Sequence, residues 1–112
     1  MANARRGEIA ATIAGQSFTL CLTLGALAEL EQAFAVDDLT ALGARFGAGR
    51  LSAEDLVRLV GAGLRAGGHA IADEDIRAWP ASCLPELAAA AAALLGATFG
   101  EPVQNPPEPQ AA

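Results

Sequence analysis

The stretch that decides the fold is residues 7–31, which read GEIAATIAGQSFTLCLTLGALAELE. Larger apolar side chains alternate with smaller or polar ones on both sides of Gly15-Gln16. The alternating positions are Ile9, Ala11 and Ile13 before this pair and Phe18, Leu20 and Leu22 after it. Alternation is typical of a half-buried strand, and glycine at the first central position suits a two-residue type II′ turn. The sequence therefore predicts a β-hairpin over residues 7–22.

The predicted turn also fixes a predicted register. Counting outward from Gly15-Gln16 pairs Ile13 with Phe18, Ala11 with Leu20 and Ile9 with Leu22, while Thr12 and Thr19 pair on the opposite face. A slip of one residue would mix apolar and polar side chains on each face, so the pattern supports the hairpin. Two strands alone are not stable in water, and helices must therefore cover the apolar face.

Two helices are predicted directly after the hairpin. The first runs from about Leu24 to Phe34 with Thr23 as its N-cap. The second is short, begins around Asp37 as N-cap and ends at the glycines of residues 47–49. Their apolar stripes are Leu24, Leu27, Leu30 and Phe34 in the first helix and Leu39, Leu42 and Phe46 in the second.

The third predicted helix has the strongest signals. Ser52 is a suitable N-cap, and Glu54 and Asp55 stand in the first turn, where carboxylates favour the helix dipole. Arg58 can pair with Glu54 one turn away. Gly67-Gly68 ends the helix. The stripe expected to face the core is Ala53, Leu56, Val57, Val60 and Leu64.

The remaining chain is predicted to hold two more helices and a tail. A short helix begins at Asp73 and is closed by Pro80, and a last helix runs from Ser82 or Leu84 to Thr98. Residues 101–112 carry four prolines and are predicted to be a disordered tail. The predicted fold is α+β, mostly α, with an N-terminal hairpin and four to five short helices. Residues 1–100 are expected to form one domain, comprising hairpin 7–22 and helical bundle 23–99.

Composition limits the classes of function. The chain has 112 residues and a net charge of −6, and its basic residues form no cluster longer than Arg5-Arg6, which argues against nucleic-acid binding. The uncharged run from Leu87 to Gly100 is shorter than the roughly 20 residues of a membrane span, so a buried helix is expected there. Cys21 and Cys83 lack any CxxC spacing and are expected to be buried thiols in a reducing cytoplasm, with one disulfide as the alternative.

No residue pattern predicts catalysis, a metal or a cofactor. His69, the only histidine, stands at no ligand spacing from either cysteine and is expected to be a loop residue. The acidic clusters Asp37-Asp38 and Asp73-Glu74-Asp75 coincide with helix starts, where capping explains them. Gly61 and Gly63 lie inside a helix rather than before one, so they indicate a close helix approach and not a phosphate loop.

Trp79 and the last helix are the best candidates for a partner surface. Trp79 stands before Pro80 and suits either a core position or a contact anchor. The alanine run from Ala88 to Ala93 allows tight packing within the chain or a flat face for a partner. The residues predicted to bind a partner are Trp79, Leu84, Leu87 and Leu94.

The chain resembles the gene transfer agent family of phage tail-assembly chaperones over about residues 5 to 98. The most specific piece is Leu-Gly-Ala-Leu-Ala-Glu-Leu-Glu at residues 24–31, directly after the hairpin. Further segments are Leu51 to Leu56, Gly61 to Gly68 and Asp73 to Ile76. The family has no catalytic residues to transfer to this chain.

The resemblance implies a cytoplasmic assembly chaperone in a bacterial host. It would bind the tape-measure protein, help recruit the tail tube protein, and leave the finished tail. Homo-oligomerisation and association with the particle stay open. The alternative is a structural tail component, a tube or connector subunit. Tube subunits usually need larger β-sheets, so the single hairpin counts against this alternative. A small enzyme or nucleotide-dependent regulator is the third hypothesis, with His69 as the best catalytic candidate.

Overall fold

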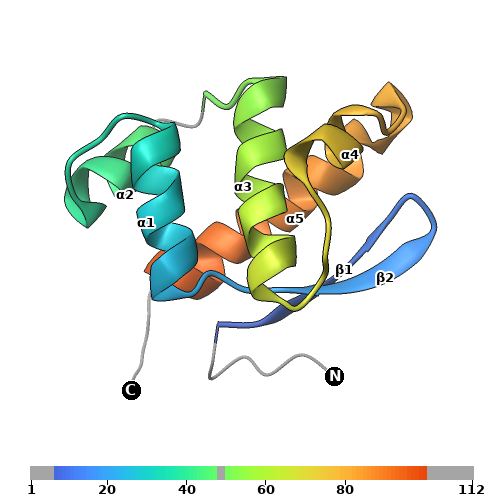
Figure 1. Cartoon of the computed structure of the whole chain (residues 1–112), viewed down its shortest axis with the longest axis horizontal. Coiled ribbons are helices and arrows are strands. Elements are labelled where there is room, and N and C mark those ends of the chain that lie inside the picture. Colours follow the sequence, from blue (N-terminus) through green and yellow to red (C-terminus); the bar gives the residue numbers. More distant parts are fainter. Residues whose placement is uncertain (1–6, 48–49, 101–112) are drawn as a thin grey trace, which may run out of the picture.

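The computed structural model describes residues 7–47 and 50–100. The strands, labelled in Figure 1 with the α-helices, are β1 (Ile9–Ile13) and β2 (Gln16–Leu20). The α-helices are α1 (Leu24–Ala33), α2 (Leu39–Gly47), α3 (Ala53–Ala66), α4 (Asp73–Arg77) and α5 (Leu84–Phe99), and a short 3₁₀ helix, η2 (Ala81–Cys83), precedes α5. A hairpin followed by helices confirms the predicted α+β, mostly α, class. The predicted disordered tail, residues 101–112, lies outside the described residues.

The hairpin exists, but its predicted register was wrong. Ile13 pairs with Gln16, Ala11 with Phe18 and Ile9 with Leu20. The turn residues are Ala14 and Gly15, whose φ angles of +54° and +79° are both positive. Two positive φ values define a type I′ turn, whose twist matches that of the flanking strands. The pairing moved by two residues, so each side chain kept its predicted face.

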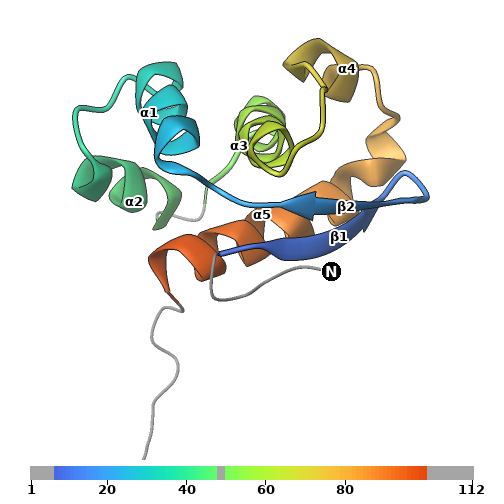
Figure 2. The same cartoon turned by 60° about the horizontal axis from the view of Figure 1, so that its bottom comes forward.

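The helices α3 and α5 cover the hairpin from different directions. Figure 2 shows α1, α3 and α4 on one side of a layer that contains the hairpin and α5. The helix α5 packs against β1 and α3, while α3 also packs against β2 and α1. All these elements contribute to one hydrophobic core, whose fully buried members include Ile13, Leu20, Leu30, Leu59, Leu64 and Leu94.

Two details of the first helices differ from prediction. Leu24 was expected in the stripe of α1, yet it is 82% exposed, and the residues of α1 that are buried in the core are Ala26, Leu27 and Leu30. The backbone N–H of Ala41 donates to the carboxylate of Asp38 at 2.8 Å, so Asp38 takes the capping role predicted for Asp37. Thr23 caps α1 as expected, accepting a hydrogen bond from Ala26 N–H at 3.1 Å.

The start of α3 confirms its sequence signals. The Ser52 hydroxyl accepts from the N–H of Asp55 at 3.1 Å, and the Asp55 carboxylate accepts from the N–H of Ser52 at 2.9 Å. This reciprocal capping box satisfies two backbone donors that the helix leaves unpaired. Arg58 and Glu54 form the predicted ion pair at 3.1 Å.

The segment Ala81–Phe99 is long and apolar enough to cross a membrane, judged by length and composition alone. The core helix of a soluble protein meets the same criterion. In this fold Leu87, Ala90, Ala91 and Leu94 of α5 are buried against the other elements.

Candidate functional site

His69 holds the hairpin against the end of α3. Its Nε2 accepts a hydrogen bond from the backbone N–H of Thr19 at 3.3 Å. The ring also meets Phe18 edge-on, with centroids 5.1 Å apart. These contacts give His69 a structural role on β2, which its loop position in the sequence did not reveal.

The two cysteines and the acidic cluster at the start of α4 also make contacts within the fold. Cys21 and Cys83 are both buried thiols outside any disulfide, as predicted, and Cys21 Sγ donates to the carbonyl of Ala66 at 3.4 Å. Within residues 7–47 and 50–100, no group of three His, Cys, Asp or Glu side chains is arranged to hold a metal ion. In the acidic cluster that begins α4, Asp73 pairs with Arg65 at 3.0 Å, and the Asp75 carboxylate accepts a hydrogen bond from Ala72 N–H at 2.9 Å.

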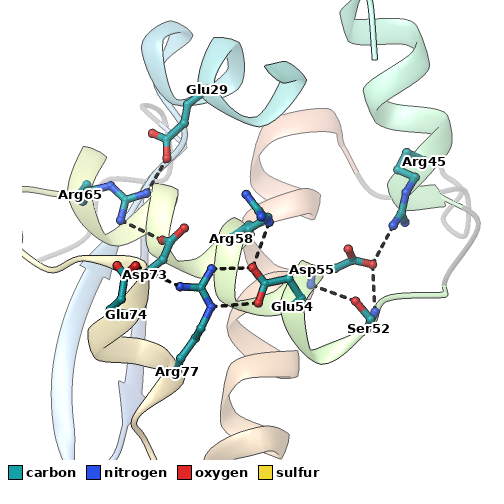
Figure 3. A network of polar contacts seen from close by, with 10 residues as sticks. All are labelled: Glu29, Arg45, Ser52, Glu54, Asp55, Arg58, Arg65, Asp73, Glu74 and Arg77. Atoms are coloured by element: carbon teal, nitrogen blue, oxygen red, sulfur yellow. Dashed lines mark hydrogen bonds and ion pairs between the residues drawn. The ribbon is translucent and has the colours of Figure 1, made fainter. Parts of the chain in front are cut away.

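A polar network joins α1, α3 and α4 on one surface, as Figure 3 shows. Arg77 donates two hydrogen bonds to Glu54, at 3.0 and 2.6 Å, and Arg58 reaches the same carboxylate. The bidentate bonds from Arg77 lower the pKa of Glu54. Arg65 contacts both Glu29 and Asp73. These pairs are largely exposed, so each contributes little stability; their effect is to fix α4 on α3.

Asp55 is the one buried charged residue of the described chain. Burial opposes its ionisation, but the hydrogen bonds from Ser52 and the ion pair with Arg45 at 2.8 Å together lower the pKa of Asp55. The carboxylate therefore stays charged at neutral pH and links α2 to the capping box of α3. Sequence patterns predicted Asp55 in the first turn, but they did not predict its partner in α2.

Glycines bring the helices close, as their place inside α3 indicated. A Cβ at Gly63 would stand 2.6 Å from Cδ1 of Leu94, and one at Gly61 would stand 2.2 Å from Oδ1 of Asp73. Gly63 therefore lets α5 approach α3, and Gly61 lets the start of α4 do the same. The prediction of close helix contacts is confirmed.

Three of the four residues predicted to bind a partner meet at one apolar groove of about 170 Å³. Trp79 is half-buried and stacks on Phe18 with centroids 6.1 Å apart, while Leu84 is 46% exposed on the rim. Leu87 is 7% exposed at the groove and belongs to the core. Leu94 is fully buried beneath Gly63 and lies outside this groove. Partner binding by these residues stays a prediction, and only Trp79 and Leu84 offer surface for it.

A second apolar groove, of about 380 Å³, lies between α2, α3 and α5 and was not predicted from the sequence. Its lining includes Phe46, Leu51, Leu56, Ala88, Ala92 and Leu95. Within the alanine run, Ala90 and Ala91 pack inside, whereas Ala88 and Ala92 face this groove, and partner binding by that face stays a prediction. The helical period was the only signal in the sequence for which alanines are exposed. It could not separate the buried face from the exposed face, because alanine occupies both.

The described structure is that of a small α+β protein whose most prominent surface features are shallow apolar grooves. The family model described as "Phage tail tube protein, GTA-gp10" matches residues 6–101, and the chain therefore belongs to this phage tail family. No curated protein and no solved structure matches the chain. The family places the chain in a phage-type tail and indicates association with the virion and partnership with tail tube protein.

This assignment overturns the prediction that the chain is an assembly chaperone that leaves the tail. The family description favours the alternative, a structural component of the tube. The chaperone prediction was wrong because the features behind it do not distinguish the two roles. Apolar helix faces, acidic charge and no predicted active site fit a chaperone and an assembly subunit equally. One hairpin was expected to be too little sheet for a tube subunit. That expectation assumed that each subunit forms its sheet alone.

Proposed function

We propose that this chain is a non-enzymatic structural subunit of a phage-like tail tube and is retained in the assembled particle. The observation that carries the proposal is the family match, which spans the whole described chain. The groups best suited to chemistry support a non-enzymatic role, since His69 accepts from Thr19 and the Asp73 carboxylate pairs with Arg65.

The surface of the described chain supports assembly with other subunits. Apolar grooves beside Trp79 and Leu84 and between α2 and α5 provide area that a neighbouring subunit would remove from water. Subunits synthesised in the cytoplasm of the host would become ordered into the tube during assembly. The predicted contact with a tape-measure protein is proposed as a contact within the tail.

The test is quantitative mass spectrometry of purified particles that carry complete tails. A tube subunit is expected at a fixed, multi-copy ratio to the tail tube and capsid proteins, in every preparation. The control is a host cytoplasmic protein of similar abundance in the lysate, which purification should remove. Abundance in the lysate together with loss from purified particles would show that the chain is not a tube component.

A further inference from the structure

The two edges of the hairpin differ in how their backbone groups are satisfied. On the outer side of β2, the N–H of Thr19 donates to His69 at 3.3 Å, and just after the strand the N–H of Cys21 donates to the carbonyl of Gly63 at 3.2 Å. The C-terminal end of α3 also presses on this edge, since a Cβ at Gly67 would stand 2.0 Å from the carbonyl oxygen of Thr19. Figure 2 shows β2 between β1 and α3.

The outer edge of β1 is uncovered by the described chain. In an antiparallel pair, alternate residues direct both backbone groups away from the partner strand. Ile13 is joined to Gln16 across the turn, so Ala10 and Thr12 are the residues whose N–H and C=O point outward. Within residues 7–47 and 50–100, no hydrogen bond from another element reaches these groups, and both residues are exposed.

This edge also lacks the features that usually protect a strand from pairing. Native edges carry charged side chains, proline or a bulge. Residues 9–13 of β1 are Ile, Ala, Ala, Thr and Ile, without charge or proline. A groove of about 190 Å³ runs beside the strand, with Ala89, Ala90 and Ala93 of α5 on its other wall. The small alanine side chains leave room for a second backbone next to β1.

We propose that β1 pairs with β1 of a second copy of this chain and forms a four-stranded antiparallel sheet, β2-β1-β1-β2, across the two copies. The inference deepens the proposed function, because a tube requires contacts between subunits. With Ala11 on the two-fold axis, Ala10 of each copy faces Thr12 of the other. Both residues then direct their backbone groups across the junction, and the uncharged edge is its own complement.

The test compares two proline variants by sedimentation equilibrium from micromolar to millimolar concentration. Ala10→Pro removes an outward N–H on β1, and Ser17→Pro, the matched control, removes one on β2. Wild type and Ser17→Pro are expected to form dimers, and Ala10→Pro is expected to weaken pairing at least about tenfold, because two symmetry-related hydrogen bonds are lost. A monomeric wild type at all concentrations, or equal weakening by both variants, would overturn the inference.

Hydrogen exchange of the wild type tests the same contact without any substitution, should Ala10→Pro fail to fold. The amides of Ala10 and Thr12 are expected to exchange more slowly as concentration rises, while that of Ser17 does not change. Unchanged exchange at Ala10 and Thr12 in a dimeric sample would place the dimer contact elsewhere. Dimerisation by a chain missing from particles would refute only the tube function. Normal incorporation of folded Ala10→Pro into particles would refute only the pairing.

Discussion

Asp55 combines two functions that sequence patterns describe separately. It completes the capping box of α3 with Ser52, and it pairs with Arg45 of α2 at 2.8 Å. Because its side chain is 10% exposed, these partners compensate for the loss of water around the charge. One carboxylate thus sets both the start of α3 and the position of α2.

The lowered pKa of Asp55 predicts a dependence of stability on pH. A depressed pKa in the folded chain means that the stabilisation is complete above the ordinary Asp pKa, about 3.9. It is lost as pH falls through the lowered value. Asp55→Asn is expected to reduce the free energy of unfolding by about 1–3 kcal/mol at pH 7 and to flatten its fall below pH 4. Urea denaturation across pH 2–7 measures both effects.

Asp37→Asn is the matched control for this prediction. Asp37 is exposed at the start of α2, and the capping bond there is made by Asp38. The control is expected to follow the wild-type pH profile. If Asp55→Asn loses as much stability at pH 2 as at pH 7, the carboxylate charge is not the source of its stabilisation.

Single residues were predictable where the partner is local in sequence. Ser52 and Thr23 cap their helices as expected, and Arg58 reaches Glu54 one turn away. Contacts between elements were not predictable, since the spacing within one helix carries no information about its neighbours. The bidentate bonds from Arg77 to Glu54, across 23 residues, are an example.

At the scale of elements, the closest approach is between the end of α3 and β2. Gly67 has an ordinary φ of −81°, so its backbone would accept any residue. There is no space for a side chain at this position, because an added Cβ would lie 2.0 Å from the carbonyl oxygen of Thr19. Since the obstacle is backbone, a change of rotamer cannot relieve it.

Gly67→Ala is therefore expected to lower the free energy of unfolding by at least about 2 kcal/mol. Gly47→Ala is the matched control, because Gly47 also lies at the C-terminal end of a helix and nothing lies within 4 Å of an added Cβ there. The control is expected to be neutral or stabilising by up to about 1 kcal/mol. Chemical denaturation measures both, and equal stability of the two variants would contradict the close approach.

The existence and type of each element were predictable, whereas register and facing were less so. Type II′ was predicted because glycine was assigned the first turn position; the structure gives that position to Ala14 with φ +54°. No sequence rule favours alanine at a positive φ. The type I′ turn is favoured because its twist matches that of the flanking strands. Leu24 follows the apolar spacing of α1, yet the neighbouring elements leave it exposed.

At the scale of the molecule, the surface offers apolar area where an assembled subunit would need it. Leu84→Glu is expected to leave the fold intact, because Leu84 is 46% exposed and a carboxylate suits the first turn of α5. The charge should reduce incorporation into particles several-fold, since a buried unpaired charge is costly. Comparing purified particles by mass spectrometry measures the loss.

Leu24→Glu is the control, because Leu24 is 82% exposed on α1 and lines none of the three described grooves. It should enter particles as the wild type does. Equal incorporation of both variants would remove the groove beside Trp79 from the assembly surface. Thermal unfolding of both variants verifies that neither loss reflects misfolding.

The candidate surface was only partly predictable. The prediction joined Trp79 and Leu84 with Leu87 and Leu94, because all four lie on or near one apolar helix. Packing divides them: Gly63 admits Leu94 to the core, while Leu84 stays on the rim. Stripes in sequence identify apolar faces, but the elements that cover each face are set by the whole fold.

The contact between β1 and α5 governs when this chain can fold on the ribosome. Ala14 and Glu86, which hydrogen-bond to each other, are 72 residues apart. At about 5–20 residues per second, the hairpin waits roughly 4–14 seconds for the helix that covers it. During that interval its apolar face and open edge are exposed together on a nascent chain. Since two strands alone are not stable in water, the hairpin becomes stable only after α5 has been synthesised.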